Sequence, residues 1–332
     1  MTHWLPAGLT AALALGLAVA APAAAADLQP LRYGQAFSAQ RSVFSLPVHI
    51  ADRHGDFARQ GLAVRQFFIP DGADKMIDAL NDGTVDLTHV ATPFLIQRVL
   101  AGDDVVAIAA EFNDPIYSLV AKPGIRSFAD LKGKLVGMAD EAGPIAMSIN
   151  RLLARHGLGP GDIRVQTISG TPQRLACLRR GGCDAVPLGQ PQDVTAQREG
   201  FAVLGTSRDV APPFLYTVTA ARRGWAGTHK DIVVRYVRAL AAAFRFIRDP
   251  ANRGAVAAII VEDTGCPEAD ARATLALYLD PERHVLPRQG EIDTGGLTRT
   301  IALMGEAGQL KAPLPPAERF VDLQYLRAAG IE

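Results

Sequence analysis

Three short loops place glycine beside small or acidic residues directly before a helical pattern begins. The loops are Asp71-Gly72-Ala73, Ala142-Gly143 and Gly170-Thr171. Such a loop points backbone N–H groups and the positive end of a helix dipole at one place, which attracts carboxylate, sulfonate or another anion. We therefore predict ligand contacts at these three loops. The alternative interpretation is that the glycines only permit tight turns.

Polar and aromatic residues near predicted strand ends extend this candidate site. Small-molecule pockets combine apolar or aromatic walls with a few polar groups that fix the orientation of the ligand. Each of the aromatic candidates named below is equally suited to the ordinary core. Among the histidines, His89 is the one placed to touch a ligand. The further predicted contacts are Phe37, Ser38, Thr92, Phe112, Asn113, Tyr117, Asp140, Gln190 and Tyr216.

Acidic residues near the same loops restrict the ligand. They are Asp71, Glu111, Asp140 and Glu141. An unpaired carboxylate beside an anionic ligand would repel it, so an amine-bearing or heterocyclic solute is an open alternative. The histidines do not have the spacing of metal ligands, and no recognisable serine, histidine and aspartate arrangement is present. We therefore expect no catalytic site, no metal and no cofactor.

The elements that must position these residues come from a duplicated unit. Residues 31–93 and 134–191 each predict strand, helix, strand, helix and strand, an alternation typical of parallel sheets with right-handed crossovers. The predicted fold class is therefore α/β with two lobes, whose ligand-facing loops meet across a cleft at the carboxyl ends of the strands. One constant spacing relates Leu80, Gly83, Asp86 and Pro93 to Leu178, Gly181, Asp184 and Pro191.

Two extended stretches, 116–121 and 214–220, are predicted to carry the chain between the lobes. Lobe 1 is then formed by residues 27–117 with 218–332, and lobe 2 by residues 118–217. A ligand that bridges both lobes is expected to close them about Tyr117 and Tyr216. Helices are predicted to pack around the lobes at 231–248, 252–262, 268–279, 294–307 and 317–329.

The charge balance and the first residues indicate where the protein acts. The 332 residues contain 34 basic and 34 acidic side chains, so no overall field attracts nucleic acid or an anionic membrane. Residues 1–26 contain no Asp, Glu, Lys or Arg, and an apolar run is followed by small residues. This pattern predicts a signal peptide cleaved near Ala26 and a periplasmic protein. An uncleaved anchor is the alternative, because the segment has no Lys or Arg.

The cysteines Cys177 and Cys183 fall on a predicted helix and on the strand that follows it. They fit two small core hydrophobic residues. A disulfide is the alternative hypothesis, because export favours oxidation and a Gly-Gly turn lies between the two residues. Cys266 stands alone, and nothing near it in the sequence supplies a base that would make it a nucleophile.

The segment Ser127-Phe128-Ala129-Asp130-Leu131-Lys132-Gly133-Lys134-Leu135-Val136-Gly137 is similar to the one that opens the second lobe in periplasmic solute-binding proteins. Asp71-Gly72-Ala73, the Leu80-x-x-Gly-x-x-Asp86 unit and Phe320-Val321-Asp322-Leu323-Gln324-Tyr325-Leu326 extend the likeness. The chain resembles the NMT1/THI5-like branch of ABC-transporter substrate-binding proteins over essentially its whole mature length. That branch includes binders of nitrate, sulfonates, taurine and pyrimidine precursors of thiamine.

The resemblance implies a type II periplasmic binding protein fold, in which each lobe is a mostly parallel sheet flanked by helices and two crossing strands form the hinge. It implies a monomer that delivers a small-molecule solute to an ABC permease and its ATPase. The branch also resembles the fungal thiamine-pyrimidine synthases, but the export signal and the absence of their consecutive cysteines beside phenylalanine disfavour an enzyme. A ligand sensor that acts on a receptor is a third interpretation.

Overall fold

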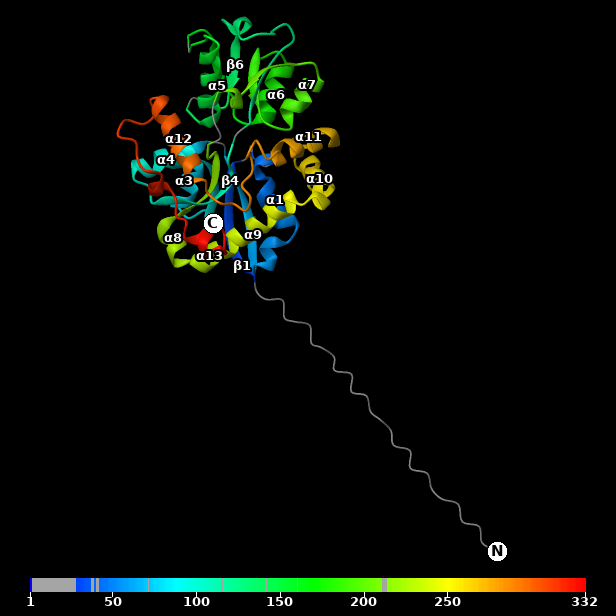
Figure 1. Ribbon diagram of the computed structural model, residues 1–332, viewed down its shortest axis with the longest axis vertical. Helices are drawn as coiled ribbons and strands as arrows, with labels where there is room; N and C mark the ends of the chain where they lie inside the picture. Colours follow the sequence, from blue (N-terminus) through cyan, green and yellow to red (C-terminus); the bar gives the residue numbers. More distant parts are fainter. Residues whose placement is uncertain are drawn as a thin grey trace.

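The computed structural model describes Met1 and residues 28–332, except 37–38, 40–41, 71, 115, 141, 160 and 211–213. The predicted signal peptide and the predicted contacts Phe37, Ser38 and Asp71 lie outside the described residues. Two five-stranded sheets, each flanked by helices, form two lobes (Figure 1). No helix in the described part of the chain is long and apolar enough to span a membrane.

Lobe 1 is built on a sheet with the strand order β2-β1-β3-β10-β4. Strand β1 pairs in parallel with β2 and β3, whereas β10 runs antiparallel to both β3 and β4. The strands are β1 (Gln29–Ala36), β2 (Leu62–Ile69), β3 (Leu87–Ala91), β4 (Val105–Phe112) and β10 (Thr217–Arg222). The helices between them are α1 (Leu46–Arg53), α2 (Asp56–Arg59), α3 (Ala73–Asn81) and α4 (Thr92–Ala101).

Lobe 2 repeats this plan with the strand order β7-β6-β8-β5-β9. Strand β6 pairs in parallel with β7 and β8, and β5 runs antiparallel to β8 and β9. The strands are β5 (Ser118–Ala121), β6 (Leu135–Met138), β7 (Arg164–Thr167), β8 (Ala185–Leu188) and β9 (Ala202–Thr206). The helices are α5 (Pro144–Arg155), α6 (Thr171–Arg179) and α7 (Gln192–Arg198).

The repeated aspartates have the same structural role in both lobes. Asp86 accepts the backbone N–H of Arg32 at 2.8 Å, which joins β3 to β1. Asp184 accepts the backbone N–H of Leu135 at 2.8 Å, which joins β8 to β6. Each carboxylate lies just before its own strand, β3 or β8, and satisfies a backbone donor of the neighbouring parallel strand. The residues that revealed the duplication in the sequence therefore hold equivalent strands together.

The helices after β10 pack on lobe 1 (Figure 1). The prediction of one helix over 317–329 was wrong, because the chain is extended at Val321, which forms a β-bridge with Ala107. This extended backbone lets Phe320 and Val321 bury their side chains in the core. The helices are α8 (Arg223–Thr228), α9 (Lys230–Arg248), α10 (Arg253–Thr264), α11 (Glu268–Leu279), α12 (Thr294–Glu306) and α13 (Gln324–Ala329).

A disulfide joins Cys177, on α6, to Cys183, just before β8. Their Cα atoms are 5.4 Å apart, within the range that a disulfide spans. This geometry is that of the bonded pair, which was the alternative interpretation of the sequence, and Cys266 is a buried free thiol. The bond ties the carboxyl end of α6 to the residues just before β8.

Candidate functional site

A cavity of about 320 Å³ lies between the two lobes. Residues at or just after the carboxyl ends of β1, β3 and β6 line it, as expected for an open α/β sheet. Its volume is at the small end of the range of about 300–1,000 Å³ that is usual for ligand pockets. Lobe 1 and lobe 2 both contribute lining residues, so a ligand here would touch both.

Two tyrosines line the side of this cavity at which the chain passes between the lobes. Tyr117 precedes β5 and Tyr216 precedes β10, and their hydroxyl oxygens are 3.0 Å apart, with one donating to the other. Phe44 stacks on Tyr117 at 5.8 Å and meets Tyr216 edge to face at 5.6 Å between ring centroids. Burial raises the pKa of Tyr117 to about 12, so its hydroxyl stays protonated at neutral pH. The aromatic cluster is thus a rigid, neutral wall beside the crossings.

Arg174, in the second turn of α6, is a buried cation on the lobe 2 wall of the cavity. Only 1% of its surface is exposed. Its guanidinium donates to the carbonyl oxygens of Pro187 at 2.7 Å and Ile168 at 3.1 Å, and to the Thr171 hydroxyl at 3.0 Å. Among the described residues, no carboxylate forms an ion pair with it. Burial lowers the pKa of Arg174 because desolvation disfavours the charge.

His89, on β3, lines the opposite wall of the cavity. Its Nδ1 lies 2.6 Å from Oε2 of Glu111, which is fully buried. Desolvation would raise the pKa of Glu111, but His89 and the hydroxyl groups of Thr219 and Tyr33 together lower it. The ionised Glu111 therefore accepts a hydrogen bond from Nδ1–H of His89. Nε2 is then the ring atom that can hydrogen-bond elsewhere.

The loop before α5 does not offer its N–H groups to the cavity. Asp140 accepts the N–H of Ala142 at 3.1 Å and also that of Gly143. The positive end of α5 is therefore occupied by a carboxylate from this chain, and neither Ala142 nor Gly143 lines the cavity. Burial raises the pKa of Asp140 despite these two bonds. The prediction that this loop contacts the ligand is not supported by its geometry.

The predicted contacts divide between the cavity and the surrounding core. Of the predicted contacts that the structure describes, six line the cavity, and these are Gly72, Tyr117, Asp140, Gly170, Thr171 and Tyr216. The backbone of Ala73 begins α3. Thr92, Phe112, Asn113 and Gln190 also lie outside the lining. Phe112 packs edge to face on Phe44, and Gln190 accepts a hydrogen bond from Tyr278 and donates one to Asp193. Glu111 lies in the lobe 1 core rather than at the rim of the cleft.

Sequence reasoning missed Arg174 and several apolar lining residues. The duplication held a signal for two of them, since Met76 and Arg174 occupy equivalent places after Gly72 and Gly170, and all four line the cavity. Apart from this equivalence, nothing in the sequence distinguishes Arg174 from Arg179, the exposed arginine of the same helix. The apolar residues that were not predicted are Ala36, Ala39, Phe44, Met76, Val90, Ala91, Phe94, Ala139 and Ile145.

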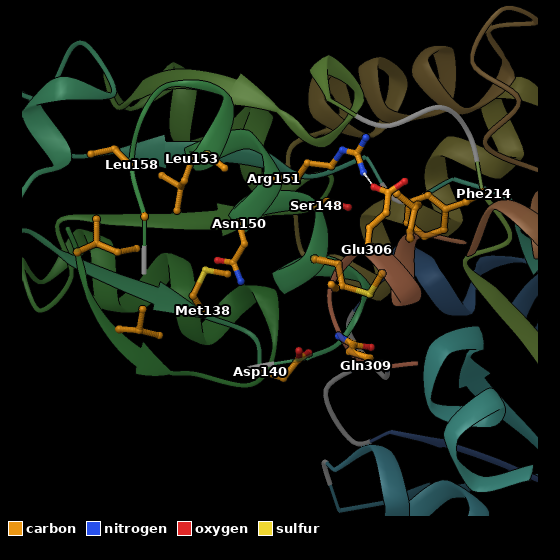
Figure 2. A pocket seen from close by; sticks show the side chains of 17 residues that line it. Met138, Asp140, Ser148, Asn150, Arg151, Leu153, Leu158, Phe214, Glu306 and Gln309 are labelled. Atoms are coloured by element: carbon orange, nitrogen blue, oxygen red, sulfur yellow. Dashed lines mark hydrogen bonds and ion pairs between the residues drawn. The ribbon is translucent and has the colours of Figure 1, made fainter. Parts of the chain in front are cut away.

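A larger groove of about 730 Å³ lies beside this cavity, and Asp140 lines both. Figure 2 shows Met138, Leu153 and Leu158 on one side of the groove and Glu306 and Phe214 on the other. Its arginine, Arg151, is paired with Glu306 (Figure 2). The groove therefore lacks the uncompensated buried cation of the smaller cavity. We take the smaller cavity as the candidate site.

Side chains also connect the lobes away from the cavity. Asp270, on α11 of lobe 1, accepts hydrogen bonds from Thr195 and Arg198, on α7 of lobe 2, each at 2.7 Å. Gln309 donates to the carbonyl oxygen of Ala142 at 2.7 Å. Arg208 contacts Asp114 at 2.6 Å close to the crossings. These contacts belong to the arrangement in which both lobes enclose the cavity.

Comparison with solved structures identifies the fold. The ligand-binding component of an ABC-type import system from Staphylococcus aureus, solved with zinc bound, superposes with a TM-score of 0.71 at 14% identity, over 91% of this chain and 99% of that one. The periplasmic nitrate-binding protein NrtA from Synechocystis PCC 6803 superposes with a TM-score of 0.69 at 15% identity, over 92% and 86%. The predicted periplasmic binding protein fold is confirmed. Within the described residues, no group of His, Cys, Asp and Glu fits a metal ion.

Sequence comparison identifies the family. The 4-amino-5-hydroxymethyl-2-methylpyrimidine phosphate synthase of Schizosaccharomyces pombe is 27% identical over 121 residues, which is 36% of this chain. The match spans only 34% of that protein's own length. A model of the NMT1-like family matches residues 41–261, which is more than half of the chain. The chain therefore belongs to the NMT1-like family.

Proposed function

We propose that this protein is the periplasmic solute-binding component of an ABC importer. It captures a small anionic or heterocyclic solute between its lobes and delivers it to a permease and its ATPase. Residues 27–117 with 218–332 move as one lobe and residues 118–217 as the other, about crossings at Tyr117 and Tyr216. The observation that carries this proposal is the cavity enclosed by both lobes at the carboxyl ends of their strands. The periplasmic and import proteins of the same fold support it.

A thermal-shift screen of the purified full chain tests this function. The panel contains sulfonates, nitrate, aromatic acids, taurine and aminopyrimidines. A solute at 100 times its Kd adds about 2.7 kcal/mol to the free energy of unfolding, because it binds only the folded state. We expect at least one class to raise the Tm in proportion to the logarithm of its concentration. A flat response to every class contradicts the proposal.

The contact between α7 and α11 predicts a conformational effect on affinity. Asp270→Asn weakens the hydrogen bonds to Thr195 and Arg198 and so destabilises the enclosed arrangement relative to a separated one. A loss of about 1 kcal/mol lowers affinity for the best solute of the screen about fivefold, measured by titration calorimetry. Arg272→Ala is the matched control, since Arg272 pairs with Glu268 on the exposed face of the same helix. Equal affinity in Asp270→Asn and the wild type would refute this coupling.

A second candidate is an enzyme that makes a thiamine pyrimidine, and the partial match to the yeast synthase is the observation that favours it. The three cysteines of this chain are a bonded pair and one buried thiol, with no two adjacent in sequence. This arrangement differs from the consecutive cysteines of those enzymes. Formation of the pyrimidine phosphate by the purified protein would support the enzyme, and solute binding without turnover would support the importer component.

A further inference from the structure

The two walls of the cavity differ in chemistry. The lobe 1 wall is mainly apolar, and its apolar side chains include Phe44, Met76, Val90 and Phe94. The lobe 2 wall is mainly polar and is formed by Asp140, Ser169, Gly170, Thr171 and Arg174, with Ala139 and Ile145 beside them. A solute that fills the cavity must therefore present a polar end to lobe 2 and an apolar body to lobe 1. A small inorganic anion would leave the apolar wall without contacts.

Arg174 determines which charge the polar end of the solute must carry. A guanidinium carries five N–H donors, and the structure pairs three atoms of this one with two carbonyl oxygens and a hydroxyl. These acceptors are neutral, and the Asp140 carboxylate attracts the guanidinium electrostatically without forming an ion pair with it. Because a buried cation without a counterion is costly, the partner that this site lacks is an anion. Asp140 attracts the guanidinium but does not form an ion pair with it, since its carboxylate accepts the N–H groups of Ala142 and Gly143 before α5.

Two polar groups lie beside the apolar side chains of lobe 1. Thr217, the first residue of β10, is 2% exposed and lines the cavity, and its Oγ1 has no hydrogen-bond partner in the described part of the chain. His89 also lines the cavity, and Glu111 holds its Nδ1. Both groups suit a single polar substituent at the far end of an otherwise apolar solute.

We propose that the cleft selects a small organic acid with an apolar, ring-bearing body, whose acid group binds Arg174 and Thr171 on lobe 2 while its body packs against Phe44 and Phe94 on lobe 1. This inference rests on the proposed function and names its substrate class. His89 and Thr217 favour acids that carry a hydroxyl group at the end remote from the acid. Arg174 is the residue that determines the preference for a charged head group.

Titration calorimetry of the full chain with five probes tests this class. The probes are benzoate, 4-hydroxybenzoate, benzamide, nitrate and taurine. We expect 4-hydroxybenzoate and benzoate to bind with a stoichiometry of one. Benzamide, which has the same shape as benzoate without the charge, should bind about 100-fold more weakly, since hydrogen bonds to charged groups are the stronger ones. Benzamide that binds as tightly as benzoate, or nitrate that binds more tightly, overturns the proposal.

Variants of α6 assign the head group to its residue. Arg174→Gln should weaken benzoate binding about 100-fold. Arg179→Gln changes another arginine of α6, which forms an exposed pair with Glu199 after α7, and should leave benzoate binding unchanged. Arg174→Lys keeps the charge and should retain part of the affinity, which keeps the test valid if Arg174→Gln does not fold. If Arg174→Lys binds benzoate as tightly as the wild type does, and its affinity for benzamide is also unchanged, the result contradicts a role for Arg174 in binding the head group.

The outcomes separate this inference from the proposed function. If taurine, nitrate or an aminopyrimidine from the screen binds while both benzoates fail, the protein is a solute-binding protein and the substrate class is wrong. If no solute of any class binds, both proposals fail. His89→Leu should remove the advantage of 4-hydroxybenzoate over benzoate without abolishing benzoate binding. An unchanged ratio of the two affinities would contradict the placement of the hydroxyl group.

Discussion

Replacing Glu111 with leucine is expected to lower the free energy of unfolding by about 3–5 kcal/mol, the cost of removing a buried carboxylate from the groups that it holds. The carboxylate is fully buried and accepts hydrogen bonds from Tyr33 at 2.9 Å and Thr219 at 2.6 Å, beside His89 at 2.6 Å. Leucine has a similar size but leaves these donors without an acceptor. Urea unfolding followed by circular dichroism measures the loss.

Two controls separate charge from packing at this position. Thr219→Val removes one donor and should cost about 1 kcal/mol. Glu111→Gln keeps an acceptor but loses the charge, so its cost should lie between those of Thr219→Val and Glu111→Leu. A loss below about 1 kcal/mol for Glu111→Leu would show that the network around this carboxylate contributes little.

The same network predicts a dependence on pH. The pKa of Glu111 is lowered in the folded protein from its usual value of 4.5. The folded state therefore binds this proton less tightly than the unfolded chain. Its contribution to stability is complete above pH 4.5 and is lost as the pH falls through the folded pKa. The stability difference between wild type and Glu111→Gln should shrink over that acid range, and a constant difference would contradict an ionised Glu111.

Removing the disulfide is the second large effect that we expect. Cys177→Ser combined with Cys183→Ser should lower the free energy of unfolding by about 2–4 kcal/mol, because the cross-link restricts the unfolded chain. The bond also ties α6 to β8, and Arg174 on α6 donates to the carbonyl oxygen of Pro187 on β8. Solute affinity should therefore fall together with stability. Thermal unfolding and calorimetry of the double variant measure both quantities.

A thiol count provides the independent check on this bond. The denatured, unreduced wild type should titrate one thiol, that of Cys266, and three after reduction. Cys266→Ser is the matched control, since Cys266 has no disulfide partner, and it should lose much less stability than the double variant. Three thiols without reduction would exclude the disulfide.

The sequence was most informative where residues repeat. The recurring Leu, Gly, Asp and Pro predicted two equivalent α/β units, and Asp86 and Asp184 proved to join corresponding strands. This pattern could be found in the sequence because the same hydrogen bond, from a carboxylate before one strand to the backbone of its parallel neighbour, requires the same residue type in both units. Tyr117 and Tyr216 were also predicted to lie at the site, and both line the cavity, each directly before a strand that follows the passage of the chain from one sheet to the other.

The details of the site depend on contacts that the sequence does not encode locally. Asp140 caps α5, so the N–H groups of Ala142 and Gly143 face a carboxylate from this chain instead of the cavity. Arg174 resembles any surface arginine in sequence and becomes a buried cation only through carbonyl oxygens at Pro187 and Ile168. Glu111 belongs to the core because of Tyr33 and Thr219, which are distant in sequence.

Small-angle X-ray scattering with and without a saturating solute tests the central claim, capture of a solute between two moving lobes. The solute is the probe that binds most tightly by calorimetry, and Asp270→Asn is measured beside the wild type. The account predicts a smaller radius of gyration on saturation, because a solute that touches both lobes stabilises the enclosed arrangement. Scattering profiles that stay identical with and without a bound solute would contradict it.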